Sequence, residues 1–256
     1  MSSPKTYLIT GANRGIGKGF TTTFLQRPST TVIATVRDTS HPTAKELAAL
    51  PKAENSRLIL VTLDSSNIDL VHKAIETLKK DYQINHIDVV IANAGIAMGG
   101  ATVRATTPEN IKDHVLVNAI GPVALFQDTV DLLQASSTKQ PIFVAISTLV
   151  GSMGSMEMLA GFPASHSPYG GSKAALNWFI RRLHFEEPWL TSFVFHPGLV
   201  ETDLAKAAVA KEGISLKDIG AISVETSVAG MIGVIDAATK ETSGTFRNYD
   251  GSALPW

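Results

Sequence analysis

Short apolar runs alternate with longer helical patterns over almost the whole chain, and this alternation restricts the fold more than any other feature. The runs are rich in Val, Ile and Leu without polar alternation, which is typical of parallel strands buried on both faces. Strands are predicted at 6–10, 31–36, 57–63, 87–93, 141–147 and 191–197, with a last short strand within 245–256. Helices are predicted at 16–27, 43–50, 68–82, 108–133, 167–187 and 224–239. This succession predicts an α/β protein with a doubly wound parallel sheet of about seven strands and helices on both faces.

Composition excludes several classes of function. The 256 residues are 44% hydrophobic, which is enough for a sizeable core, and no linker or repeat divides them, so a single domain over 1–256 is expected. The formal net charge of −1 gives no reason to expect a nucleic acid partner. The chain has no cysteine, and His166, His184 and His196 lack the spacing of metal ligands, so no metal is expected. Without an apolar leader or an apolar run of about 18 residues, a cytoplasmic protein with no membrane partner is expected.

The first predicted strand leads into a glycine-rich turn, TGANRGIG at 10–17, and then into a helix. Glycines allow a tight turn and a close backbone approach, and a helix N-terminus offers free N–H groups to a phosphate. The pattern predicts a pyrophosphate site formed by Gly11, Asn13, Arg14, Gly15, Ile16 and Gly17. Its spacing differs from the common G-x-G-x-x-G pattern, and a glycine turn without a ligand is the alternative.

The end of the second predicted strand indicates which dinucleotide fits. Where an acid normally holds the ribose of NADH, this chain has Val36, and Arg37 follows it. Arg37 and Arg14 together suit the 2′-phosphate of NADPH, because a guanidinium group binds phosphate in a bidentate manner. NADPH/NADP+ is therefore the predicted cofactor. The alternative is that Asp38 holds the ribose and that Arg37 is a solvated charge at the end of the strand.

Six motifs occur in the order found in one known family. They are TGANRGIG (10–17), ANAG (92–95), VNAIGP (117–122), STLVG (147–151), YGGSK (169–173) and HPGLVETD (196–203). The chain thus resembles the short-chain dehydrogenase/reductase family in its single-domain form, from Tyr7 to the tail. The stretch TVRD and the tail resemble its carbonyl-reductase and fungal ketoreductase branches. The resemblance implies a Rossmann fold and the NADPH-dependent reduction of a ketone or aldehyde to an alcohol, with a small-molecule carbonyl compound as the substrate.

Tyr169 and Lys173 lie four residues apart and share one face of a predicted helix, with Ser167 as its N-cap and Pro168 as its first residue. A neighbouring ammonium and a helix N-terminus both favour phenolate, so the pKa of Tyr169 is expected to lie below its free value of about 10. The phenol then gives a proton to a carbonyl oxygen as hydride reaches the carbon. The resemblance adds that Lys173 hydrogen-bonds the nicotinamide ribose. Two glycines between the pair indicate room for a cofactor or close helix packing.

The resemblance also implies two supporting side chains. A hydroxyl residue three positions before a glycine is the second donor to the carbonyl oxygen, which selects Thr148 by its spacing to Gly151, with Ser147 as the alternative. Neighbouring strand residues point to opposite faces, so only one of the two is expected to reach the substrate. Asn118 matches a helix asparagine that holds a water between the lysine and bulk solvent. Its alternative role is a hydrogen bond to its own helix backbone.

The remaining cofactor contacts are likewise implied by the resemblance. Asn93 stabilises the central strand on the cofactor side, next to Gly95, and Asp64 bonds the adenine amino group. The loop that holds the nicotinamide amide contains Pro197, Gly198, Val200 and Thr202. All of these residue types also occur in ordinary turns, which is the alternative for each.

Substrate choice is expected to lie in segment 152–166, which is longer than is common in the family and rich in methionine. Because methionine adapts to irregular apolar surfaces, the segment is predicted to form a wall for a bulky apolar or aromatic ketone. Packed loop core or an oligomer contact is the alternative. Residues 204–220 are predicted to close over the substrate as a lid.

Other functions stay open at this point. One is NAD-dependent alcohol oxidation, which is the same reaction in the reverse direction. A catalytically silent dinucleotide-binding regulator is another, although such proteins usually lose the pair of Tyr169 and Lys173. A Rossmann-like methyltransferase would not need that pair. A homo-oligomer is also open, because this fold often pairs through its fourth and fifth helices.

Overall fold

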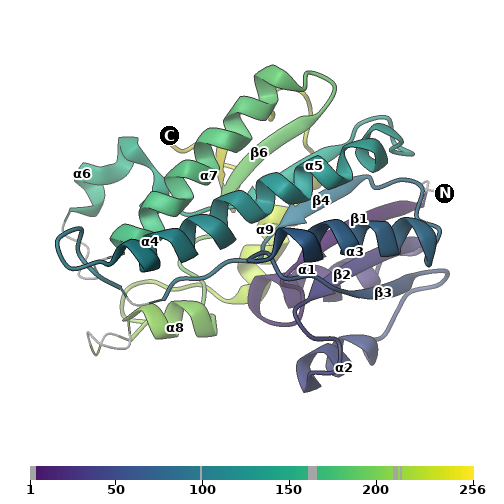
Figure 1. Cartoon of the computed structure of the whole chain (residues 1–256), viewed down its shortest axis with the longest axis horizontal. Coiled ribbons are helices and arrows are strands. Elements are labelled where there is room, and N and C mark those ends of the chain that lie inside the picture. The colour runs from purple at the N-terminus through teal and green to yellow at the C-terminus, as the bar shows by residue number, and fades with distance from the viewer. Residues whose placement is uncertain (1–3, 99, 161–165, 210–212, 214) are drawn as a thin grey trace.

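The computed structural model describes residues 4–98, 100–160, 166–209, 213 and 215–256. Within these residues, seven strands form one parallel sheet in the order β3-β2-β1-β4-β5-β6-β7 (Figure 1). The strands are β1 Lys5–Thr10, β2 Thr30–Val36, β3 Arg57–Thr62, β4 Val89–Ala92, β5 Ile142–Ile146, β6 Thr191–His196 and β7 Phe246–Asn248. The predicted doubly wound parallel sheet is confirmed.

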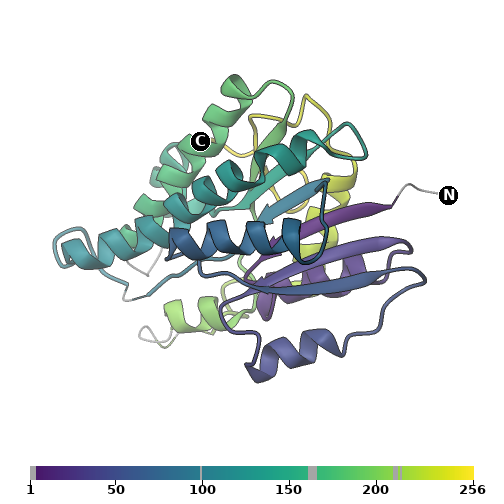
Figure 2. The ribbon, with the colours of Figure 1, turned by 45° about the vertical axis from the view of Figure 1, so that its right-hand side comes forward.

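Helices cover both faces of the sheet (Figures 1 and 2). Their bounds are α1 Gly15–Leu25, α2 Pro42–Ala48, α3 Ile68–Lys80, α4 Pro108–Val115, α5 Gly121–Gln134, α6 Met156–Leu159, α7 Ser167–Glu186, α8 Asp203–Val209 and α9 Val224–Asp236. One buried cluster joins the sheet to α1, α2 and α9, and a second joins it to α3, α5 and α7. Successive residues of β1 alternate between the two clusters, as the pleat of a strand requires.

The starts of several helices follow from local sequence. Asn67, Thr107 and Ser223 precede α3, α4 and α9, and each side chain accepts a hydrogen bond from the amide three residues later. Helix α7 begins at Ser167, so the residue before the helix is His166 rather than Ser167, and Pro168 is its second residue rather than its first.

The helix predicted over 108–133 is interrupted by one turn of a different kind. Residues Leu116–Ile120 form a π-helical turn between α4 and α5, with Asn118 at its centre. A π turn holds one residue more than an α turn and often lies at a functional site. By length and composition, Pro108–Gln134 as a whole is long and apolar enough to cross a membrane, and half of its most apolar window is buried in the fold.

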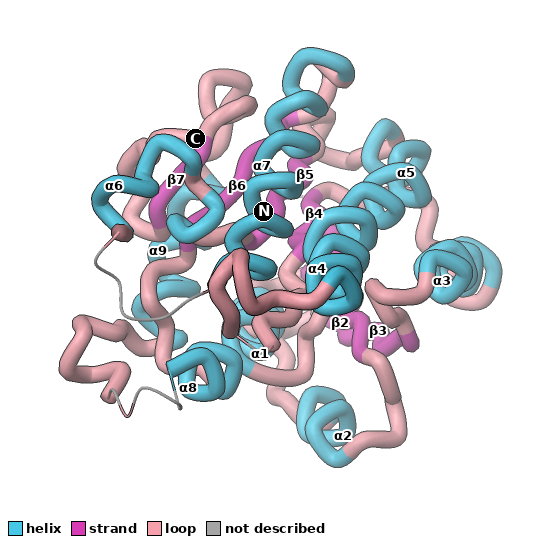
Figure 3. Tube along the Cα trace, turned by 60° about the vertical axis from the view of Figure 1, so that its left-hand side comes forward, coloured by secondary structure: helices cyan, strands magenta, loops and turns pink. Residues whose placement is uncertain are grey.

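The strand order places β1 beside β4 in the middle of the sheet, so the chain connections run in opposite directions from this point. In such sheets the crevice at the carboxyl ends of the two central strands is the usual ligand site. Helices α4, α6 and α8 lie beyond that end of the sheet (Figures 1 and 3). The start of β1 lies at the opposite end (Figure 2).

Candidate functional site

The glycine turn after β1 has the backbone geometry of a phosphate cradle. Gly11 and Gly15 have φ of 63° and 51°, which other residues adopt only with strain. A Cβ atom on Gly17 would collide with the Gly11 carbonyl oxygen and lie 2.7 Å from Asn93 Nδ2. The turn ends at Arg14, the residue before α1, so the free N–H groups of this helix face the cradle. The structure thus favours glycine at 11, 15 and 17, and the pyrophosphate site stays a prediction.

Hydrogen bonds fix this turn to the neighbouring strand. Asn93 Nδ2 donates to the Thr10 carbonyl oxygen at 2.8 Å, and the Asn93 amide donates to Thr10 Oγ1 at 3.0 Å. The Ala94 amide also donates to Thr10 Oγ1, at 2.9 Å. Asn93 therefore joins the ends of β1 and β4. Thr10 was missed by the sequence analysis, although a buried threonine at the end of a strand is a recognisable signal.

The end of β2 presents the predicted basic groups. Val36 is buried, whereas Arg37 and Arg14 are exposed. Asp38 Oδ1 accepts bonds from the amide and hydroxyl of Ser40 at 2.8 and 2.7 Å, and these bonds hold the pKa of Asp38 below its usual range. One oxygen of Asp38 is thus used by its own turn.

Asn13 connects the glycine turn to α2. Its Nδ2 donates to Thr43 Oγ1 at 2.7 Å, and the Thr43 amide donates to His41 Nδ1 at 3.3 Å. His41 is thereby the N-cap of α2, which begins at Pro42, one residue before the predicted start.

Tyr169 and Lys173 lie in the first turns of α7, where the sequence predicted them. The Lys173 ammonium is 5.9 Å from the centre of the Tyr169 ring. Lys173 Nζ donates to the carbonyl oxygen of Ile146, the last residue of β5, at 2.7 Å. Lys173 is buried and Tyr169 is half-buried. Among the described residues, none forms a hydrogen bond with the Tyr169 hydroxyl, which leaves it available to another molecule.

The expected lowering of the Tyr169 pKa is wrong for the protein alone. Burial raises the pKa of Tyr169 to about 12 and lowers the pKa of Lys173 to about 7. Loss of water disfavours the charged form of each group. The phenol therefore keeps its proton, and the Lys173 ammonium loses its proton more readily. The sequence showed the neighbouring charge but not the depth of burial.

Glycines pack closely around Lys173. A Cβ on Gly151 would lie 2.7 Å from Lys173 Cβ, and a Cβ on Gly95 would lie 3.6 Å from Lys173 Nζ. A Cβ on Gly170 would similarly lie 2.9 Å from the Val150 carbonyl oxygen. Gly171 has open space instead, so close packing explains only the first of the two glycines between Tyr169 and Lys173.

Asn118 ties the π turn to the loop after β4. Its Oδ1 accepts from the Ile96 amide and its Nδ2 donates to the Ile96 carbonyl oxygen, both at 2.9 Å. Nδ2 also donates to Ser172 Oγ, which donates to the Tyr169 carbonyl oxygen at 2.7 Å. Asn118 therefore does not bond its own helix. It links the loop at Ile96 to the turn of α7 that carries Tyr169.

The two hydroxyl residues after β5 differ in their partners. Ser147 Oγ donates to Asn177 Oδ1 at 2.5 Å, and Asn177 Nδ2 donates to the Gly151 carbonyl oxygen at 3.1 Å. Thr148 Oγ1 accepts a long bond of 3.3 Å from the Val150 amide, which leaves its own proton for another acceptor. Asn177, which the sequence analysis missed, lies four residues after Lys173 on the same helix face.

The other predicted cofactor contacts lie in well-defined turns. Asp64 Oδ1 accepts from the amide and hydroxyl of Ser66 at 2.9 and 2.7 Å. Gly198 has φ of 83°, and Thr202 Oγ1 accepts from the Ala205 amide at 3.2 Å. A bridge joins Val200 to residue 222, which holds the loop after Pro197 against the chain beyond α8. Ile16 lies in the first turn of α1.

His196 at the end of β6 accepts a hydrogen bond from the Leu149 amide through Nδ1, at 3.3 Å. Burial lowers the pKa of His196 to about 4, so the ring is neutral at physiological pH. His196 thus holds the backbone that follows Thr148 in place. Within the described residues, no group of three His, Asp or Glu side chains is placed to hold a metal ion.

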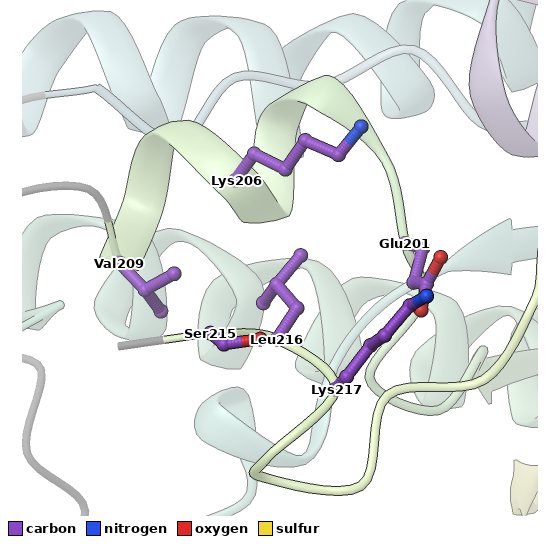
Figure 4. A pocket seen from close by; sticks show the side chains of 6 residues that line it. All are labelled: Glu201, Lys206, Val209, Ser215, Leu216 and Lys217. Carbon is purple, nitrogen blue, oxygen red and sulfur yellow. The ribbon is translucent and has the colours of Figure 1, made fainter. Parts of the chain in front are cut away.

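The segment after Thr148 presents methionines to solvent. Met153, Met156 and Met158 are 67%, 56% and 68% exposed, so these side chains are not packed loop core. Residues 161–165 of the predicted wall, Phe162 included, lie outside the described residues. A cavity of about 300 Å³ lies within the predicted lid, between α8 and the segment 215–217 (Figure 4). Its lining consists of Glu201, Lys206, Val209, Ser215, Leu216 and Lys217.

Comparison with known proteins agrees with this geometry. The family model for short chain dehydrogenases matches residues 5–213. The chain is 40% identical to a norsolorinic acid ketoreductase of Aspergillus parasiticus, over 98% of this chain and 90% of that protein. It is also 40% identical to a short chain dehydrogenase of Penicillium aethiopicum, over 99% of this chain and 100% of that protein. Among solved structures, an NADPH-bound carbonyl reductase from chicken fatty liver superposes with a TM-score of 0.86 at 28% identity, covering all of both chains. Sequence, fold and relatives thus agree that the chain belongs to the short chain dehydrogenase family of NAD(P)-dependent oxidoreductases.

Proposed function

We propose that this chain reduces a ketone or aldehyde to an alcohol with NADPH, and that Tyr169 gives the proton to the carbonyl oxygen. The observation that carries the proposal is the state of the pair in α7. The Tyr169 hydroxyl has no hydrogen-bond partner among the described residues, the Lys173 ammonium lies 5.9 Å from the centre of its ring, and the phenol, whose pKa is raised, is protonated at neutral pH. A protonated donor is what carbonyl reduction needs, whereas alcohol oxidation needs a base in the same place.

The residues at the carboxyl end of the sheet suit the cofactor. The cradle of Gly11, Gly15 and Gly17 would take the pyrophosphate, and the loop from Pro197 to Thr202 would take the nicotinamide amide. The preference for NADPH is supported by exposed Arg14 and Arg37, by apolar Val36, and by the engagement of Asp38 with Ser40. Asp64, Asn93 and Gly95 complete the proposed contacts. The chemistry that a bound nicotinamide supplies is hydride transfer to the carbonyl carbon.

The side chains of this protein would donate the proton to the carbonyl oxygen and then replace it. As the carbonyl carbon gains hydride, the Tyr169 O–H bond breaks and its proton forms the O–H bond of the product alcohol. Lys173 stabilises the phenolate that remains, and its lowered pKa makes it a ready donor to restore the phenol. Thr148 is the proposed second donor to the carbonyl oxygen, because the Ser147 hydroxyl is already used by Asn177. Asn118 positions Tyr169 through Ser172.

The proposed substrate is a bulky apolar or aromatic ketone. Exposed Met153 and Met156 lie in the segment after Thr148, and a flexible thioether side chain suits a broad apolar surface. Curated relatives named as ketoreductases support a ketone rather than an alcohol as the reactant. The near-neutral net charge fits a cytoplasmic single-domain enzyme that acts on a small molecule without a nucleic acid or membrane partner.

The test is NADPH and NADH oxidation over a panel of aldehydes, quinones and bulky aromatic ketones, with Tyr169→Phe as the control that removes a single hydroxyl. We expect turnover with NADPH to fall about 10³-fold in the variant, with NADPH binding unchanged, because only the proton donor is lost. In the same assay, Thr148→Val should lower turnover more than Ser147→Ala. Binding of NADPH without turnover on any substrate would favour a silent regulator, and preferred turnover of alcohols with NAD would favour the dehydrogenase direction.

A further inference from the structure

The last residues of the chain fold back along the sheet. After β7 the chain turns, and Ala253 forms an antiparallel bridge with Arg247. The Leu254 amide donates to the Phe246 carbonyl oxygen at 2.9 Å. Leu254 and Trp256 then pack against the core cluster that includes α7. Residues 253–256, here called the tail, are thus part of the fold.

The tail is bound to the segment that follows Thr148. Ser152 is buried, and its Oγ donates to the Pro255 carbonyl oxygen at 2.8 Å. The Gly154 amide donates to the Trp256 carbonyl oxygen at 2.6 Å. A Cβ on Gly154 would lie only 3.0 Å from Pro255 Cβ, so glycine lets the two backbones approach. The position of residues 152–154 is therefore coupled to the position of the tail.

The Trp256 ring holds the tail in place. The Arg181 guanidinium of α7 lies 4.9 Å from the centre of this ring, within the range of a cation–π interaction. The Phe246 ring of β7 lies 5.8 Å from it on a tilted plane. One side chain thus contacts the helix that carries Tyr169 and the last strand of the sheet.

The segment bound by the tail continues directly into the exposed methionines. On its other side, Gly151 packs against Lys173 at the candidate site. Met153 and Met156 lie within or next to the part that the tail holds. Contacts with α7 therefore fix the start of this segment, and contacts with the tail fix the next turn.

We propose that Trp256 is a positioning residue for substrate choice, which holds residues 152–155 so that the methionines form one wall of the substrate site. This inference rests on the proposed reductase function. Trp256 does not act on the reacting atoms. It sets the distance between the methionine wall and Tyr169. A bulky ketone would contact this wall, whereas a small aldehyde would not reach it.

The experiment compares Trp256→Ala, the conservative Trp256→Phe and the matched control Trp178→Ala in the full chain. Trp178 lies on α7, and its side chain is 60% exposed. Among the described residues, its ring contacts Phe179 edge to face and lies under the Arg182 guanidinium. For a bulky aromatic ketone, we expect Trp256→Ala to raise KM about 10-fold with kcat within about 2-fold, because the wall and not the chemistry is displaced. For a small aliphatic aldehyde, kcat/KM and the Kd of NADPH should stay within about 2-fold. Trp256→Phe should restore most of the KM, and Trp178→Ala should match the wild type.

A structural measurement separates this proposal from the reductase assignment. Hydrogen exchange of the Gly154 amide should become faster in Trp256→Ala and stay slow in Trp178→Ala, since only the former loosens its acceptor. If the wild type reduces no carbonyl compound, the reductase function fails. If it does, but Trp256→Ala changes both substrates equally or neither, the positioning role is overturned. Should Trp256→Ala not fold, Ser152→Ala replaces it, with an expected rise of about 3-fold in KM for the bulky ketone alone.

Discussion

The two ends of the sheet each hold a buried ionisable group, and the two groups differ in how many hydrogen-bond partners surround them. At the amino end, Asp88 precedes β4 and accepts four hydrogen bonds. The donors are the Thr6 amide at 2.8 Å, the hydroxyls of Ser136 and Ser137 at 2.7 and 2.9 Å, and the Thr138 amide at 3.2 Å. They join the starts of three strands, β1, β4 and β5. The carboxylate at this end is satisfied and serves stability.

At the carboxyl end, the Lys173 ammonium has one carbonyl acceptor and a pKa lowered to about 7. No acidic side chain among the described residues accepts a hydrogen bond from this ammonium. The Tyr169 hydroxyl beside it forms no hydrogen bond with a described residue. A buried charge without compensation costs stability and is kept where chemistry needs it. Asp88 is therefore assigned a structural role and Lys173 a functional one, at opposite ends of the same sheet.

The strongest test of this comparison is Lys173→Met. We expect turnover to fall about 10³-fold, because the phenolate left after proton transfer loses its neighbouring charge. At pH 6 the free energy of unfolding should rise by about 1 kcal/mol, because burial of the uncharged methionine carries no desolvation cost of a charge. Steady-state kinetics and urea unfolding measure the two effects. A variant that is less stable at pH 6 and still turns over would contradict the functional assignment.

The complementary change is Asp88→Ala. Four buried or partly buried donors lose their acceptor, so the free energy of unfolding should fall by about 3 kcal/mol. Below the unfolding transition, kcat/KM should stay within about 2-fold of the wild type, since the catalytic pair lies at the opposite end of the sheet. Ser137→Ala removes a single donor and is the milder control. A loss of turnover comparable to that of Lys173→Met would show that the two ends are not separate.

The smallest expected effect is a dependence of stability on pH. The pKa of Lys173 is about 7 in the folded protein and about 10.4 when unfolded, so between these values the unfolded chain binds more protons. The free energy of unfolding should therefore rise with pH across this window, by about 1 kcal/mol from pH 7 to 9 after allowance for local relaxation. Urea unfolding at several pH values measures the slope, and Lys173→Met should abolish this part of it. If the pH dependence of the free energy of unfolding is unchanged in the variant, a group other than Lys173 is titrating.

Local signals were enough to predict the sheet and most of the candidate site. Apolar runs gave the strands, the glycine turn gave the cradle, and the spacing of Tyr169 and Lys173 placed both in the first turns of α7. These features depend on residues close together in the sequence. The predicted cofactor preference also used only a strand end and a turn, and it stays a prediction.

Interactions between distant segments were beyond the sequence analysis. The bond from Ser147 to Asn177 depends on how α7 lies against β5, and so does the bond from Lys173 to the Ile146 carbonyl oxygen. The raised pKa of Tyr169 depends on burial by several segments together, which outweighs the local charge that the sequence revealed. Such terms follow from packing, which a linear pattern does not encode.

The wide turn at Leu116–Ile120 constrains how the gene for such a chain can change over evolution. Its geometry depends on the number of residues between the two ends of the helix, and Asn118 meets Ile96 and Ser172 only while that number is kept. Loss of one codon would convert the turn to ordinary α-helix and remove the widened backbone around Asn118, while α4 and α5 would keep nearly the same relative rotation, because a π turn covers about the same angle with one residue more. Many substitutions in this helix leave the count intact, whereas a single insertion or deletion does not. Between 108 and 134, evolution is therefore expected to preserve the number of residues more strictly than their identity.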